Sequence, residues 1–404
     1  MDTIEKKGSL LSGSLLIAGT SIGAGMLGIP LVTGLAGFAP CIAANLISWF
    51  FMMCTGLLFL EATLWMEDGA NVLSMSKRFL GTFGQAISGA SFIFLYYCLL
   101  TAYFAAGSPL FLHVLQNLFG LCLSSEWGFL LFFSVFFLIL FLGLRITDRM
   151  NFLLISGMTL SYVILIGMGS SEVEAERLTS QNWPLSILSF PVLFSAYGYH
   201  NVIPSISTYL KRNVKKLRLS IIIGSSIPLI VYSIWQWMIV GSLPRELLIE
   251  TLEKGAPVTE ALHTATKNPW MSSMCKYFSL FAIVTSVLGV SLSMIDFFGD
   301  GLKIKERSGF ARFPLCFLVF FPPLCFVWIK PTIFSASLEL AGGFGEAILN
   351  GLIPIMMVWV GRYHMGLPSV KPLFGGKIVL SLLALFTLFI VVLETVLLYQ
   401  GSHH

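Results

Sequence analysis

The chain of 404 residues is 56% apolar and only 11% charged, and its formal net charge at pH 7 is +4. Soluble globular domains carry about 25% charged residues, so this composition excludes a soluble globule and predicts a protein with many membrane-spanning helices. The small net charge gives no indication of nucleic-acid binding. The seven cysteines show no metal-binding spacing, so we expect neither a metal site nor a cofactor.

Apolar runs long enough to cross a bilayer predict eleven transmembrane helices. They lie at 9–38, 40–66, 84–112, 127–144, 150–169, 184–209, 217–241, 270–298, 313–329, 332–360 and 375–399. The first run is membrane-length and lacks a small-residue cleavage site, so we expect it to stay in the membrane as a helix. One transmembrane domain is therefore expected over 1–400, and residues 401–404 have the composition of an expression-tag remnant.

The basic residues predict the orientation of these helices. Most Lys and Arg residues lie in alternate connections, with the largest group between the sixth and seventh helices: Lys211, Arg212, Lys215, Lys216 and Arg218. Connections rich in Lys and Arg stay on the cytoplasmic side. The pattern predicts a multi-pass protein of the cell (inner) membrane, surrounded by lipid, with a cytoplasmic N-terminus and an external C-terminus.

The first predicted helix is interrupted near its middle by Gly23, Gly25, Gly28 and Pro30. An interior glycine costs about 1 kcal/mol relative to alanine, and proline removes a backbone hydrogen bond. Opened backbone at this depth is tolerated only where it is buried in protein or lines a cavity, because lipid offers no hydrogen bonds. The interruption therefore predicts a binding site in the middle of the membrane.

The sixth predicted helix is interrupted in the same way, by Gly198 and Pro204, and both interruptions end in Ile-Pro. Paired interruptions in corresponding places of two halves are typical of secondary transporters. Five helices in each half would give the halves opposite orientations, so we expect inverted repeats at about 9–169 and 184–360, with the helix at 375–399 outside them. Two ordinary kinked helices are the alternative.

Three segments, Gly19–Pro30, Phe190–Ile206 and Ser286–Val290, resemble the signature segments of the bacterial hydroxy/aromatic amino acid permease family, in the amino acid/polyamine/organocation superfamily. The resemblance implies an all-α LeuT-type fold with discontinuous first and sixth helices. It also implies ion-coupled import of tyrosine above all, and of tryptophan or phenylalanine, by alternating access. The polar connection 241–268 would then cover the outer vestibule as a lid, with a passive surface loop as the alternative.

A zwitterionic amino acid at this depth needs donors for its carboxylate and acceptors for its ammonium group, because an unpaired buried charge is costly. The half-helix after the first break would offer free N–H groups to the carboxylate, and both breaks would offer carbonyl groups to the ammonium. The expected donors are Gly23, Ala24 and Gly25, and the expected acceptors are Thr20, Ser21, Phe194 and Ser195.

Aromatic side chains near the two breaks predict a pocket for the ligand ring. The candidates are Tyr96 and Tyr97 in the third helix and Phe194 and Tyr197 in the sixth. Phe344, which lies among glycines in the tenth helix, is a candidate gate, and His200 is a candidate hydrogen-bond partner or protonation switch. Ordinary packing is the alternative role for the aromatic residues, as is a neutral structural histidine for His200.

Two coupling ions fit the sequence. His200, Glu339 and Glu346 offer titratable groups within predicted spans, where ionisable residues are usually functional. In LeuT-type folds, however, two hydroxyls of the eighth helix and carbonyls of the first form a sodium site. The corresponding residues here are Thr285 and Ser286, with Ser21 and Ala24. The resemblance favours the proton, and sodium remains the alternative.

Other functions fit the sequence less well than a carrier does. A sodium-coupled carrier of other neutral amino acids would use the same breaks. An ion channel usually needs symmetric subunits or a ring of selectivity groups, which this chain does not show. A membrane enzyme built on Ser195, His200 and Asp296 would lack the strand-turn-helix context of a nucleophile elbow. The sequence therefore favours a carrier and not an enzyme.

Overall fold

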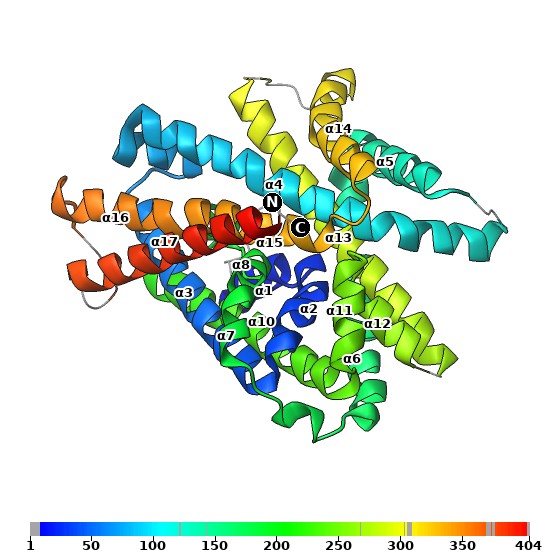
Figure 1. The fold of residues 1–404 in the computed structure, drawn as a ribbon. Coiled ribbons are helices and arrows are strands. Elements are labelled where there is room, and N and C mark those ends of the chain that lie inside the picture. Colours follow the sequence, from blue (N-terminus) through cyan, green and yellow to red (C-terminus); the bar gives the residue numbers. More distant parts are fainter. Residues whose placement is uncertain are drawn as a thin grey trace.

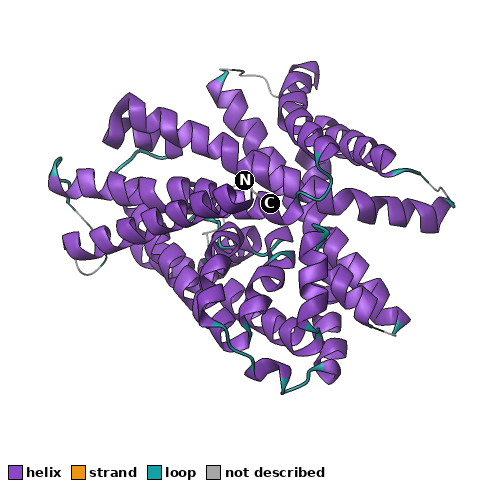
Figure 2. Ribbon diagram, in the orientation of Figure 1, coloured by secondary structure: helices purple, strands orange, loops and turns teal. Residues whose placement is uncertain are grey.

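The computed structural model describes residues 9–120, 123–142, 144–266, 268–302, 304, 309–368, 373 and 376–401, and over these residues the chain is helical with no strand (Figures 1 and 2). Nine of the described helices are long and apolar enough to cross a membrane, and a bent pair raises the number to ten. The chain is therefore an all-helical polytopic membrane protein. The predicted tag remnant lies, apart from Gly401, outside the described residues.

The long helices follow the predicted spans in order. They are α3 (Phe38–Leu64), α4 (Val72–Phe119), α5 (Ser125–Leu142), α6 (Leu144–Gly169), α10 (Val214–Ser242), α13 (Pro269–Gly301), α14 (Phe313–Ile329), the run of α15 (Phe334–Leu340), η8 (Ala341–Leu352) and α16 (Ile353–Tyr363), and α17 (Gly376–Gly401). The α4 helix begins well before its predicted start because Asn71 and Ser74 form a capping box, and it kinks at Gly81, whose φ is +71°.

The first predicted helix is broken where the glycines predicted. α1 (Leu10–Ser21) ends before Ile22 and Gly23, which are extended, and the short η1 (Ala24–Leu27) and α2 (Ile29–Thr33) follow at an angle of 46°. Pro30 lies in the first turn of α2, where a missing N–H costs no helical hydrogen bond. The break is thus set by local backbone chemistry.

The predicted span 184–209 is not one helix. It is divided into α7 (Trp183–Ser186), η5 (Ile187–Ser189), α8 (Phe190–Ala196), η6 (His200–Val202) and α9 (Ile203–Tyr209). The chain between α8 and η6 is non-helical at Tyr197 and Tyr199, and Pro204 lies in the first turn of α9. The second predicted break is therefore confirmed, and it is longer than the first.

The tenth predicted span contains a wide π-helical stretch, η8, rich in glycine and alanine. It packs against α4, α8 and α17. The small residues allow this contact: a Cβ at Gly342 would overlap the carbonyl oxygen of Pro191 in α8. π-helical segments are rare and frequently occur at functional sites.

Two short helices, α11 (Arg245–Glu253) and α12 (Val258–Ala265), form the predicted lid-like connection, which we call the cap. The turn between them uses Gly255 at φ +62°. The cap packs on α2 and α13, and Leu248 fills the space above Gly34. Figure 1 shows the cap at the side of the bundle where α2 and α6 lie.

Candidate functional site

A cavity of about 300 Å³ lies where the two broken helices meet. It is lined by residues of α1, η1, α4, α13 and η8 and of the second break. Most of the predicted site residues line it: Thr20, Ser21, Gly23, Ala24, Gly25, Tyr96, Ser195, Thr285, Ser286 and Glu346. The structure thus brings together at one point residues that are more than 300 positions apart in the chain.

The first break approaches the second very closely at Gly25. A Cβ at this position would lie 3.2 Å from Ala196 Cα, at the end of α8. The N–H of Ala24 donates to Ser286 Oγ at 2.9 Å, so one of the three N–H groups predicted to bind a carboxylate is already engaged. Gly23 itself lies against Ser286, whose side chain occupies the place of a Cβ.

Two residues of α10 that the sequence analysis missed hold the breaks together. The hydroxyl of Tyr232 donates to the carbonyl oxygens of Ser21, at 2.7 Å, and Ala196, at 2.9 Å. Trp235 Nε1 donates to the Met26 carbonyl at 3.1 Å. Both side chains are fully buried. Nothing in the sequence of α10 distinguishes them from ordinary buried aromatics, because their partners are backbone carbonyls of distant segments.

Glu346 is the buried carboxylate of the cavity. It lies on η8, is 3% exposed, and accepts a hydrogen bond from Asn350 Nδ2 at 2.5 Å. Its carboxyl group reaches the second break, where a Cβ on Gly198 would lie 2.9 Å from Glu346 Cδ and closer still to Oε1. Within the described part of the chain, no basic side chain pairs with it. Glu346 can therefore hold a proton or face a ligand cation.

The cavity wall from α4 supplies aromatic and apolar surface. Tyr96, Leu99 and Tyr103 line it, and all three are largely buried. Tyr96 stacks on Phe92, with ring centroids 4.1 Å apart. Tyr103 and Leu99 were not predicted, although they follow Tyr96 at helical spacing and could have been found from it.

Several predicted substrate residues do not line the cavity: Tyr97, Phe194, Tyr197, His200 and Phe344. His200 is fully buried and its Nε2 hydrogen-bonds with Thr55 Oγ1 at 3.0 Å, on the α3 side of the break. The Tyr197 hydroxyl donates to Asn45 Oδ1 at 2.6 Å, and Phe194 stacks on Phe51.

Tyr97 and Phe344 contact other helices instead. The Tyr97 hydroxyl donates to the Leu318 carbonyl at 2.8 Å, and the Phe344 ring meets Phe94 edge-on. A helical face does not predict side-chain directions in an irregular break, so the aromatic residues around it turn toward α3 and only Tyr96 of the predicted ring-binding set reaches the cavity.

Of the acidic residues Glu339, Glu346 and Glu394, one lines the cavity and the others lie elsewhere. Glu346 lines the cavity, whereas Glu339 on α15 does not. Glu394 lies near the end of the last predicted span, but it is only 2% exposed and packs against Gly343 of η8. Its burial follows because α17 lies against η8 along this stretch.

The two candidate sodium ligands of α13 also line the cavity, but both are engaged. Thr285 Oγ1 and Ser286 Oγ donate to the same carbonyl, that of Ala282, at 3.0 and 2.8 Å. Ser286 Oγ also accepts the Ala24 N–H. The Ser21 carbonyl is occupied in turn by Tyr232. These contacts reduce the number of oxygens that point freely at a cation.

The cavity extends toward the end of the bundle at which α1 begins. Leu15 and Leu16, in the middle of α1, line it and are half exposed. In the opposite direction, Trp235 covers the η1 backbone and Leu338 packs against Gly28. Packed side chains therefore bound the cavity on the side of the cap, and its exposed lining lies along α1.

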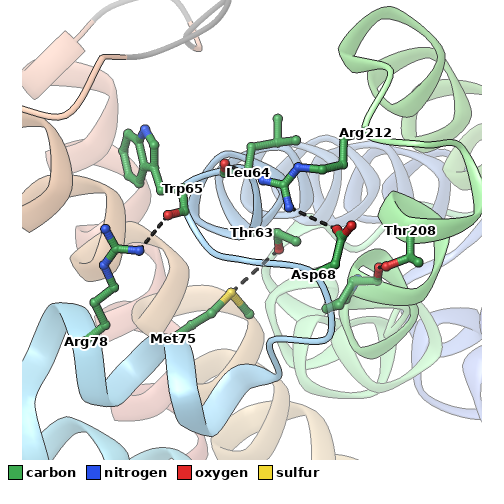
Figure 3. A network of polar contacts seen from close by, with 9 residues as sticks. Thr63, Leu64, Trp65, Asp68, Met75, Arg78, Thr208 and Arg212 are labelled. Atoms are coloured by element: carbon green, nitrogen blue, oxygen red, sulfur yellow. Dashed lines mark hydrogen bonds and ion pairs between the residues drawn. The ribbon is translucent and has the colours of Figure 1, made fainter.

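Two arginines tie the helices together at the end away from the cap, and Figure 3 shows the contacts of one of them, Arg212. Arg212, just after α9, donates to Asp68 Oδ1 at 3.0 Å and to the Leu64 carbonyl at 2.6 Å, which joins the second broken helix to the end of α3. A bidentate pair between Arg362 and Glu61 joins α3 to α16. A movement of α9 would have to break the Arg212 contacts or move the end of α3 together with α9.

The chain is similar over most of its length to known transport proteins. The sequence model of the tryptophan/tyrosine permease family matches residues 6–394. The tyrosine-specific transport system 1 of Haemophilus influenzae is 32% identical over 92% of this chain and 92% of its own length. A tryptophan-specific transport protein of Pseudomonas aeruginosa is 28% identical over 95% of this chain and 94% of its own, and one of Haemophilus influenzae is 30% identical over 95% and 94%.

Proposed function

This chain belongs to the tryptophan/tyrosine permease family, and from that premise we propose that it imports an aromatic amino acid, tyrosine foremost, together with a proton. As a member of this family it is an aromatic amino acid permease and not an enzyme. The observation that carries the proposal is the cavity at which both backbone breaks, the α4 aromatic wall and the Glu346 carboxylate meet.

The cavity suggests how the substrate lies. The carboxylate of the substrate accepts hydrogen bonds from the N–H groups of Gly23 and Gly25, at the positive end of the half-helix. Its ring lies along Tyr96, Leu99 and Tyr103 on α4, where aromatic contacts add about 0.5–1.5 kcal/mol per pair beyond the burial of area. This arrangement needs no basic side chain to hold the carboxylate.

The ammonium group has two possible partners in this arrangement. Carbonyls of the breaks, those of Thr20 and Ser195 among them, can accept its protons, and Glu346 lies across the same cavity. A protonated Glu346 can still accept an ammonium hydrogen bond through its carbonyl oxygen, and it leaves no unpaired charge in the empty cavity. Proton symport therefore requires that Glu346 be protonated while the substrate is bound.

The proton is favoured over sodium for a reason visible in the contacts. The Ser286 hydroxyl donates a hydrogen bond to the Ala282 carbonyl and accepts one from the Ala24 N–H. The Ser21 carbonyl accepts a hydrogen bond from the Tyr232 hydroxyl. Sodium would need to displace some of these bonds. One observation still supports sodium as the coupling ion. Thr285 Oγ1 lines the cavity and has lone pairs that could bind a cation.

The two breaks also support alternating access in a LeuT-type repeat. In the positive-inside orientation, the cavity opens toward the cytoplasm and the cap closes the outer side. Opening outward would then require the cap to move away from α2, and Met26 and Gly28 to separate from Trp235 and Leu338, while the half-helices α1 and α9 close the inner path.

Uptake into proteoliposomes tests the whole proposal. Labelled tyrosine should accumulate under an imposed inward proton gradient with choline replacing sodium on both sides, and unlabelled tyrosine, tryptophan and phenylalanine should compete while leucine and alanine should not. Accumulation that requires an inward sodium gradient would show that sodium, and not the proton, is the coupling ion. Equal competition by leucine would remove the aromatic specificity.

A further inference from the structure

A second cavity, of about 540 Å³, lies under the cap and is separate from the first. Its walls come from the second half of α4, from the turn between α11 and α12, from the start of α13 and from the chain just before α15. We call it the cap cavity. It shares no lining residue with the cavity at the breaks, so the transport site does not explain it.

Lys276 is the unpaired cation of the cap cavity. It is half-buried near the start of α13, and its Nζ donates to His113 Nε2 on α4 at 2.7 Å. Among the residues that the structure describes, it has no carboxylate partner. Lys254, on the other side of the cavity, is exposed and already pairs with Glu250 at 2.7 Å. An ammonium group has three donors, and the contact with His113 uses one.

The two histidines of the cap cavity do not supply a competing charge. His113 accepts the Lys276 hydrogen bond through Nε2, which requires a neutral ring. His263, on α12, is hydrogen-bonded to Ser272 Oγ through Nδ1 at 2.5 Å. Burial, and then the neighbouring Lys276 charge, lower the pKa of His263, so that its ring is neutral at pH 7. The other titratable groups that line the cavity are Glu260, which is exposed at its rim, and Cys275.

The rest of the wall is apolar and gives the cavity the character of a site for an organic molecule. Ala105, Ala106, Pro109, Leu110 and Pro257 line it. Its volume lies in the range of ligand pockets, which are mostly apolar with a few polar groups that fix orientation. A bare inorganic anion would leave this apolar surface uncovered.

We propose that the cap cavity binds a small organic solute through its carboxylate group, which Lys276 receives while the apolar wall covers the solute's hydrocarbon part. The solute is either the transported amino acid before it enters, in which case the inference rests on the proposed function, or another carboxylic acid. In the positive-inside orientation the cavity lies on the outer face, where such solutes arrive.

Binding to the purified full-length protein in lipid nanodiscs tests this proposal. The probes are 3-phenylpropionate, which has a carboxylate and no ammonium, phenethylamine, which has the reverse, and tyrosine. Each is titrated calorimetrically into protein carrying Gly25→Leu, which blocks the site at the breaks. We expect 3-phenylpropionate to bind and phenethylamine not to bind. Absence of 3-phenylpropionate binding overturns the proposal.

Variants of the two lysines locate the site. Lys276→Met should weaken 3-phenylpropionate binding by on the order of tenfold or more, because a charge-assisted hydrogen bond is lost. The matched control is Lys254→Met, which removes a lysine already paired with Glu250 and should change the affinity by less than about twofold. Equal effects of the two substitutions refute the assignment to Lys276.

A measurement on unsubstituted protein covers the case in which Lys276→Met does not fold. Saturating 3-phenylpropionate should slow reductive methylation of Lys276 and leave that of Lys254 unchanged, as read by peptide mass spectrometry. Equal rates with and without the probe overturn the proposal. Tyrosine binding to the Gly25→Leu protein identifies the transported amino acid as the occupant, whereas 3-phenylpropionate binding alone identifies another carboxylic acid. Tyrosine uptake by the unsubstituted protein tests the proposed function separately.

Discussion

Replacing Gly198 by alanine tests whether the contact between the second break and Glu346 matters for transport. A Cβ at this position would lie 2.9 Å from Glu346 Cδ, whereas ordinary contacts begin at 3.4 Å, and it would overlap Oε1. The carboxyl group must therefore retreat by roughly 0.5–1 Å, or the break must widen. A displacement of 1 Å at a functional site can cost about 100-fold. We expect kcat/KM for proton-driven tyrosine uptake to fall by about 10–100-fold.

The control for this variant is Gly19→Ala, because Gly19 lines the same cavity and a Cβ there would have no neighbour within 4 Å. Initial rates of labelled tyrosine uptake into proteoliposomes, at matched protein density, compare the two. Adding Glu346→Asp to Gly198→Ala should recover part of the loss, since the shorter side chain makes room for the new methyl group. Wild-type uptake by Gly198→Ala would refute the reasoning, as would equal losses in both glycine variants.

Four further outcomes are expected. Gly25→Leu should abolish uptake without preventing membrane insertion, because its side chain would meet the α8 backbone; normal uptake would remove the site from the first break. Glu346→Gln should abolish accumulation driven by a pH gradient but retain tyrosine exchange, and unchanged accumulation would exclude Glu346 as the proton carrier. Thr285→Ala should leave proton-driven uptake within about twofold of normal, and a complete loss would favour the sodium alternative. Tyr232→Phe should lower the free energy of unfolding by about 1–3 kcal/mol, because two buried carbonyls lose their donor; an unchanged thermal midpoint would contradict this.

The features that the sequence predicted well are local ones. Gly23 and Pro30, or Gly198 and Pro204, weaken a helix through the backbone of the residue itself, so the breaks follow from the chain alone. Membrane-length apolar runs likewise predicted the long helices, because span length is set by the bilayer. The same local chemistry explains why 184–209 is not one helix.

The features that the sequence analysis missed depend on contacts between distant segments. The direction of His200 follows from Thr55, which lies 145 positions away. Tyr232 looks like an ordinary buried aromatic until its hydroxyl meets two carbonyls. Glu394 is buried because α17 lies on η8, and no property of α17 itself predicts that contact.

The Tyr232 hydroxyl has a mechanical consequence for the broken helices. A hydroxyl has one proton, and here that proton is shared by the last carbonyls of α1 and α8. α1 also lies along α10, where the absence of a side chain at Gly224 lets Ile17 approach the α10 backbone. A tilt of α1 that preserves the shared hydrogen bond must pivot about Ser21, at the C-terminal end of the helix. The swing is then largest at the N-terminal end of α1 and smallest beside the Gly23 and Gly25 amides, so the path can open or close while the carboxylate contacts proposed for these amides stay nearly still.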